Sequence, residues 1–176
     1  MRTKLMTLAL ALLVPASGAM AQSRTILPVP LKPVVAAEHR SCAQRTPSGL
    51  GYTVLRSAAG KRPTPADVAQ INYIGYLAAN GEVFDQSNEA ILSVSGLIDG
   101  FTEGLQLMPL GSIYRFCVPA ALAYGTEGVA AIPPNAELVF QVELVDVRSR
   151  AEIEAAMRAQ SGPEEDAANS AVQPDD

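Results

Sequence analysis

The stretch VAQINYIGYLAANGEVFDQS, Val68 to Ser87, decides the fold. Apolar residues alternate with polar ones over 68–77, which predicts a strand with one face in a core; the apolar set is Ala69, Ile71, Tyr73 and Leu77. The pair Asn80-Gly81 follows, and both residue types accept a positive φ at low cost. The stretch therefore predicts two antiparallel strands joined by a short hairpin turn.

Three further segments predict strands of the same sheet. In IPPNAELVFQVELVDV, residues 132–147, one face carries Leu138, Phe140, Val142 and Leu144, while Glu137, Gln141 and Glu143 point away from it. GLGYTVLRSAAG, residues 49–60, is typical of a strand closed by a turn, and SIYRFCVPA, residues 112–120, predicts another strand.

Two segments have helical spacing. In Gly100 to Met108, the apolar residues Phe101, Leu105 and Met108 recur at helical intervals, so we expect a short helix across the sheet. A second helix is predicted in AEIEAAMRAQ, residues 151–160, where it would flank the domain. Several antiparallel strands with one short central helix indicate an α+β fold.

The chain divides into five regions. Residues 1–21 begin with basic residues, continue with an apolar run too short to span a bilayer, and end in a small-x-small motif, which predicts a signal peptide cleaved after Ala21. Export to a Gram-negative periplasm, or secretion, is the expectation. We then expect a proline-rich arm without a fold at 22–46, a domain at 47–150, a flanking helix at 151–161 and a disordered acidic tail at 162–176.

Charge and cysteine content limit the partners and the compartment. Cleavage would remove two of the 13 basic residues and none of the 18 acidic ones, leaving a net charge of about −7. Nucleic acid and anionic membranes are therefore poor partners, and a cysteine for a lipid anchor at the cleavage site is lacking. In an oxidising compartment Cys42 and Cys117 could pair; the alternative is two unpaired thiols.

Candidate catalytic groups of the usual kinds are scarce. The one histidine, His39, falls in the arm, which leaves a nucleophilic serine or cysteine without a base, and we find no metal-ligand cluster or phosphate-binding loop. What remains is an aromatic and aliphatic set that suits an apolar ligand pocket: Tyr73, Phe84, Ile98, Phe101, Tyr124, Ile132 and Phe140.

Four motifs in order resemble the FKBP-type peptidyl-prolyl cis-trans isomerases. They are VAQINYIGYLAANGEVFDQS, LIDGFTEGLQLMPLGS, ALAYG and IPPNAELVFQVELVDV, and the resemblance extends over about residues 48–147. It implies an antiparallel sheet of five to six strands wrapped around one short helix, which agrees with the pattern of the residues. It also implies rotation of X-Pro bonds without a cofactor or a metal.

The resemblance assigns roles to individual residues. Asp85, Tyr124, Ile98 and Phe101 would be catalytic, with the Tyr124 phenol and the Ile98 N–H holding substrate carbonyls. The substrate-binding set would be Tyr73, Phe84, Leu92, Leu97, Ile132 and Phe140, with Ile132 as a wall in a flap from Tyr124 to Pro134. Taken singly, each aromatic residue could be ordinary core, and Asp85 could simply cap a turn.

The chain departs from the family pattern at the pocket. Phe101 stands where members most often have tryptophan, which predicts a deeper floor without an indole N–H. Leu92 occupies a commonly aromatic position, and Val129 stands at the flap tip where some members have histidine. These differences bear on substrate preference, rate and affinity for macrolide inhibitors.

The resulting expectation is an isomerase for proline-containing, folding exported proteins, with macrolides as inhibitors. The alternatives are a weakly catalytic chaperone or binding module on the same fold, and an inert scaffold. Because the arm is short and lacks the helical dimerisation region of larger exported members, a monomer is expected.

Overall fold

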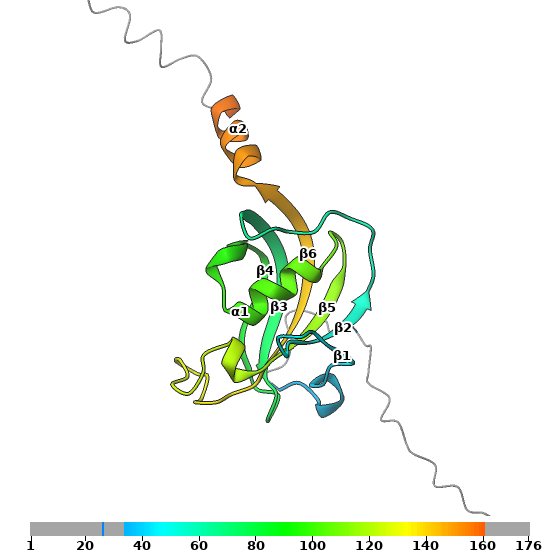
Figure 1. The fold of residues 1–176 in the computed structure, drawn as a ribbon, viewed down its shortest axis with the longest axis vertical. Helices are drawn as coiled ribbons and strands as arrows, with labels where there is room; N and C mark the ends of the chain where they lie inside the picture. Colours follow the sequence, from blue (N-terminus) through cyan, green and yellow to red (C-terminus); the bar gives the residue numbers. More distant parts are fainter. Residues whose placement is uncertain (1–25, 27–33, 161–176) are drawn as a thin grey trace, which may run out of the picture.

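The computed structural model describes residue 26 and residues 34–160, and within them one six-stranded antiparallel sheet forms the frame (Figure 1). The strands lie in the order β1-β2-β5-β6-β3-β4. Their bounds are β1 Gln44–Arg45, β2 Gly51–Arg56, β3 Asp67–Leu77, β4 Val83–Ser93, β5 Ile113–Val118 and β6 Leu138–Ser149. The strands predicted from alternation are confirmed, and so is the α+β class.

The helix α1, Asp99–Leu107, crosses one face of this sheet, which we call the helix face. Leu105 is fully buried, and Phe101 is 5% exposed. At Gly104 an added Cβ would lie 2.9 Å from the Phe116 ring, so glycine lets the helix approach β5 closely. The helix begins and ends one residue earlier than predicted, because Met108 is extended ahead of Pro109.

The predicted hairpin turn between β3 and β4 is confirmed at Asn80-Gly81. Five residues, 78–82, connect the strands, and only Gly81 among them has a positive φ, at 77°. The Leu77 N–H donates to the Glu82 carbonyl and the Gly81 N–H to the Leu77 carbonyl. Asn80 instead uses its side-chain oxygen to accept the Glu82 N–H, and the Asn-Gly pair lies in the turn as predicted.

On the opposite face of the sheet, the strap face, the N-terminal segment 34–43, which we call the strap, covers the part around Ile74 and Tyr76. Val34 bridges to Glu82, and a single turn of 3-10 helix, Ala37–His39, precedes Cys42. A disulfide joins Cys42 to Cys117 of β5, which decides between the two alternatives left open by the sequence. Residues 34–46, expected to belong to an unfolded arm, are thus part of the folded unit.

A second apolar cluster lies between strap and sheet: Val35, Ile74, Tyr76, Cys117 and Val139. The buried Tyr76 hydroxyl donates to the His39 carbonyl at 2.7 Å, and burial raises the pKa of Tyr76 to about 12. Gln141 points away from the helix face as predicted, yet it is 4% exposed on this second, covered face.

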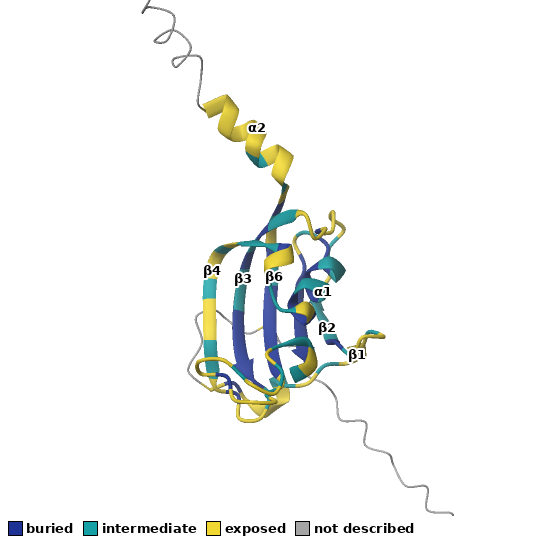
Figure 2. Ribbon diagram, turned by 60° about the vertical axis from the view of Figure 1, so that its left-hand side comes forward, coloured by how far each residue is buried: buried dark blue, intermediate teal, exposed yellow. Residues whose placement is uncertain are grey.

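The helix α2, Arg150–Gln160, continues directly from β6 and projects from the sheet (Figure 2). Its side chains are exposed except for the half-buried Ile153. None of the helices in residues 34–160 has the length and hydropathy needed to cross a bilayer. The predicted signal peptide, 1–21, and tail, 162–176, lie outside the described residues.

Candidate active site

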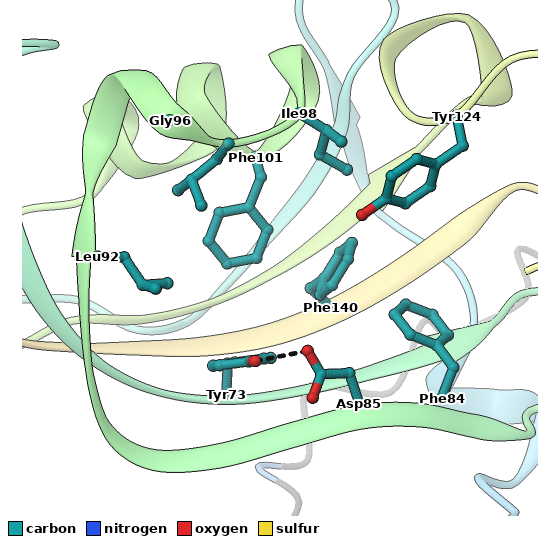
Figure 3. A pocket seen from close by; sticks show the side chains of 10 residues that line it. Tyr73, Phe84, Asp85, Leu92, Gly96, Ile98, Phe101, Tyr124 and Phe140 are labelled. Atoms are coloured by element: carbon teal, nitrogen blue, oxygen red, sulfur yellow. Dashed lines mark hydrogen bonds between the residues drawn. The ribbon is translucent and has the colours of Figure 1, made fainter. Parts of the chain in front are cut away.

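A pocket of about 480 Å³ opens on the helix face, between β3, β4, β6 and the chain that leads into α1 (Figure 3). Its lining is mainly aromatic and aliphatic. The residues are Tyr73, Phe84, Asp85, Leu92, Gly96, Leu97, Ile98, Phe101, Tyr124 and Phe140. The tertiary structure thus brings together nine of the ten site residues predicted from the sequence.

The floor of the pocket is a set of rings packed edge to face. Phe101 comes from the first turn of α1 and meets Phe140 of β6 with ring centroids 4.8 Å apart. Phe84 packs edge-on against Phe140 at 5.6 Å. An added Cβ at Gly75 would lie 2.7 Å from the Phe140 ring, so this glycine makes room for the cluster.

Asp85 and Tyr73 form the hydrogen-bonded polar pair of the pocket. The Tyr73 hydroxyl donates to Asp85 Oδ2 at 2.6 Å, as the dashed line in Figure 3 marks. Burial first, and then the Asp85 carboxylate, raise the pKa of the Tyr73 phenol above its ordinary value. Tyr73 therefore stays protonated as a donor and holds the carboxylate in one orientation.

A bulge places two consecutive β4 residues on the pocket side. Gly75 of β3 pairs with Asp85, but its neighbour Tyr76 pairs with Val83, so Phe84 is an extra residue in β4. In a regular strand neighbouring side chains point to opposite faces. Because of the extra residue, Phe84 and Asp85 both line the pocket.

Tyr124 reaches the pocket from the loop that follows β5. The residue is 41% exposed, and its hydroxyl points into the space above Phe140 in Figure 3. Ile98 is the residue directly before α1, and its carbonyl accepts the N–H groups of Phe101 and Thr102. A carboxylate, a phenol and a backbone edge thus surround an otherwise apolar space.

Two residues differ from the sequence expectation. Ile132, expected as a pocket wall, is not among the lining residues; it is 8% exposed in the main core and bridges to Val129. Gly96, which was not predicted from the sequence, lines the pocket beside Leu97. A residue without a side chain gives no apolar or polar signal, so only its position before Leu97 and Ile98 could have indicated it.

The geometry contains no metal site in the part of the chain that the structure describes, since no three histidine, cysteine or acidic residues gather there. The pocket provides an apolar enclosure and a few oriented hydrogen-bonding groups.

Comparisons with known proteins identify the family of the chain. Residues 60–145 match the family described as FKBP-type peptidyl-prolyl cis-trans isomerase. The chain is 42% identical to the FKBP-type peptidyl-prolyl cis-trans isomerase FkpA of Aeromonas hydrophila, over 60% of this chain and 41% of the relative. It is 41% identical to the outer membrane protein MIP of Legionella longbeachae, over 60% of this chain and 47% of the relative.

The matched part therefore spans less than half the length of these two curated relatives. Among solved structures, a peptidyl-prolyl cis-trans isomerase from Pseudomonas syringae pv. tomato superposes with a TM-score of 0.58 and 33% identity. That match covers 60% of this chain and 80% of the solved chain. Sequence and fold together show that the chain belongs to the FKBP-type peptidyl-prolyl cis-trans isomerase family.

Proposed function

We propose that this protein catalyses cis-trans isomerisation of X-Pro bonds in polypeptides. The observation that carries the proposal is the aromatic pocket whose hydrogen-bonded polar pair is Tyr73 and Asp85. Resonance keeps the prolyl amide planar and gives rotation a barrier of about 18–20 kcal/mol. The twisted amide has lost that resonance and separates less charge, so an apolar enclosure favours it over the planar ground state.

Three groups around the pocket would orient the substrate. The Tyr124 hydroxyl and the Ile98 N–H would donate to carbonyls on either side of the proline, and Phe101 would support the ring from below. The Asp85 carboxylate would lie beside the rotating bond, held there by the Tyr73 hydroxyl. Such a mechanism needs no nucleophile and no proton transfer.

A weakly catalytic chaperone is the second candidate. The observation that favours it is the lining of the pocket, where Phe101 and Leu92 provide apolar contact but no hydrogen-bond donor. Such a pocket could hold proline-containing segments with little discrimination between planar and twisted amides. A chaperone would suppress client aggregation regardless of the isomerisation rate.

The decisive experiment follows the cis-to-trans relaxation of short X-Pro peptides with the chain from Gln22 onward. We expect acceleration by the wild-type chain, loss of it with Asp85→Ala, and competition by a rapamycin-like macrolide. Circular dichroism of the variant checks that it remains folded. A folded wild-type chain that does not accelerate relaxation would overturn the isomerase proposal and favour the chaperone.

We also propose that the protein works in the bacterial envelope, on folding exported polypeptides. The disulfide between Cys42 and Cys117 supports an oxidising compartment, and the basic, apolar and small-residue pattern of 1–21 supports export. Cell fractionation with mass determination of the mature chain tests this. A full-length chain with reduced cysteines in the cytoplasm would contradict it.

A further inference from the structure

A second irregularity in β4, opposite the β3 residue that precedes Tyr73, also shapes the pocket. Ile71 and Tyr73 are two residues apart in β3, but their partners in β4, Ala90 and Ser87, are three residues apart. One extra residue is therefore inserted around Asn88 and Glu89. The insertion reverses the alternation of side chains along β4 beyond this point.

This reversal brings Asp85 and Leu92 into one pocket. The two residues are separated by an odd number of positions, so in a regular strand their side chains would point to opposite faces. Both line the pocket in the structure, and Leu92 pairs with Ala69 on the helix face. Without the insertion, Leu92 would leave the pocket and Ile91 would replace it.

The insertion requires Glu89 to adopt a backbone conformation that glutamate disfavours. Glu89 has φ 54°, in the left-handed region that residues other than glycine rarely adopt. Its N–H donates to Asn72 Oδ1 at 2.8 Å. Asn72 is the β3 residue that lies opposite the insertion, on the strap face.

Asn72 is itself fixed by a chain of polar contacts across the strap face. Its Nδ2 donates to Glu143 Oε2 at 2.9 Å, and Glu143 Oε1 accepts from Arg56 Nη2 at 2.6 Å. The Arg56 side chain also donates to the Gly111 carbonyl. The Asn72 hydrogen bond and then Arg56 lower the pKa of Glu143, so its carboxylate stays ionised as an acceptor.

We propose that Asn72 is a positioning residue for the pocket: through the Glu89 N–H it holds the β4 insertion that keeps Leu92 beside Asp85. It acts from the face of the sheet opposite to the substrate and does not touch it. The kinetic test rests on the proposed isomerase function, while the structural test does not.

The experiment compares four variants of the chain from Gln22 onward. Asn72→Ala removes the hydrogen bond to the Glu89 N–H. Gln70→Ala is the matched control, two residues earlier on the same face of β3 and opposite Ile91. Glu89→Gly makes the positive φ favourable even without that hydrogen bond. The double variant Asn72→Ala/Glu89→Gly therefore tests whether glycine at this position restores the β4 insertion. The structural readout is the NMR contact between the methyl groups of Ala69 and Leu92, which the observed register requires.

We expect Asn72→Ala to weaken that contact in favour of one between Ala69 and Ile91. We also expect KM for X-Pro peptides to rise about fivefold to tenfold, as loss of one backbone-anchoring hydrogen bond would give. Gln70→Ala and Glu89→Gly should leave both readouts near wild type. The double variant should recover them, whereas a purely structural role for Asn72 would give no recovery.

An unchanged Ala69–Leu92 contact in Asn72→Ala would overturn the inference, and so would a double variant that stays as impaired as the single one. A wild-type chain that is inactive but shows the contact would refute the proposed function instead. The NMR result would then still decide the role of Asn72.

Discussion

The two faces of the sheet differ in how completely their apolar side chains are covered. The helix face is covered by α1 but leaves a pocket of about 480 Å³, where Tyr73 and Phe84 are only half-buried. The strap face is closed over Val35, Ile74 and Tyr76, which are at most 2% exposed. The Cys42–Cys117 disulfide secures the strap face, while ring packing and the Tyr73–Asp85 hydrogen bond shape the helix face.

The difference shows how a small domain combines stability with a partly open core. The apolar side chains that line an unfilled pocket are not fully buried, so the pocket lacks burial that would otherwise stabilise the fold. The strap adds a second cluster on the opposite face and is tied to β5 by the disulfide. We therefore expect perturbations of the strap face to change stability and perturbations of the helix face to change ligand binding.

Removal of the disulfide should have the largest effect. The bond closes a loop across 75 residues, and a cross-link that closes a loop of that size stabilises the folded state by about 4.5 kcal/mol in the chain-entropy account. Cys42→Ser/Cys117→Ser should lose about that much in urea unfolding, yet still bind a proline peptide under folding conditions. Loss of binding in a folded double variant would show that the two faces are not independent.

Filling the space at Gly75 should be the next largest effect. An added Cβ would lie 2.7 Å from the Phe140 ring and 2.8 Å from Phe84, so Gly75→Ala overpacks the pocket floor and should cost about 1–3 kcal/mol. At Gly96, an added Cβ would meet only Ser93 Cβ, at 3.8 Å. Gly96→Ala should therefore unfold like the wild type in the same titration, and equal destabilisation of the two variants would contradict this account.

Tyr73→Phe should affect activity at the pocket of the helix face and leave the strap face unchanged. It removes the hydroxyl that donates to Asp85 at 2.6 Å and keeps the ring that packs near Phe101. We expect kcat/KM for X-Pro peptides to fall about tenfold, the loss expected when a charge-assisted hydrogen bond no longer orients Asp85. An unchanged kcat/KM would mean that the orientation of Asp85 does not limit the reaction.

The same pair makes a prediction about pH. Because the pKa of Tyr73 is raised by burial and by Asp85, Tyr73 should remain protonated through the range in which exposed tyrosines ionise. Ultraviolet titration of the folded wild type and of Tyr73→Phe should therefore coincide near pH 10. A phenol that titrates there in the wild type and is missing in the variant would contradict a buried, hydrogen-bonded Tyr73.

Glu143 should give the smallest effect, on the strap face. Its pKa lies below the ordinary value of 4.5, so the stability it contributes is present above that pH and is lost as the pH falls through the lowered folded-state pKa. Because its side chain is 33% exposed, the change should be modest. Urea titrations from pH 7 to 3 should show a steeper acid loss for the wild type than for Glu143→Gln, and parallel curves would exclude the contribution.

Much of the fold could be predicted because it depends on local alternation. The strands around Ile71 and Phe140 and the helix around Leu105 follow from spacing that one face of a sheet imposes. Residue types suggested an apolar pocket, but the roles of its residues came from the family resemblance, since a Phe or Tyr on a strand has the same local signal whether it lines a pocket or fills a core. Ile132 illustrates this, because it carries the same signal and lies in the core.

The sequence by itself determined the sheet, the central helix, the place of the β3–β4 turn and the family, because these depend on residues close together in the chain or on motifs in order. Only the tertiary structure decided which surfaces are covered. The disulfide between Cys42 and Cys117 joins segments that are distant in sequence. The hydrogen bond from the Glu89 N–H to Asn72 joins strands that are one residue out of register there, and Gln141 is buried on the strap face. The physical reason is that burial and hydrogen bonding depend on what packs above each strand, and alternation along one strand carries no record of it.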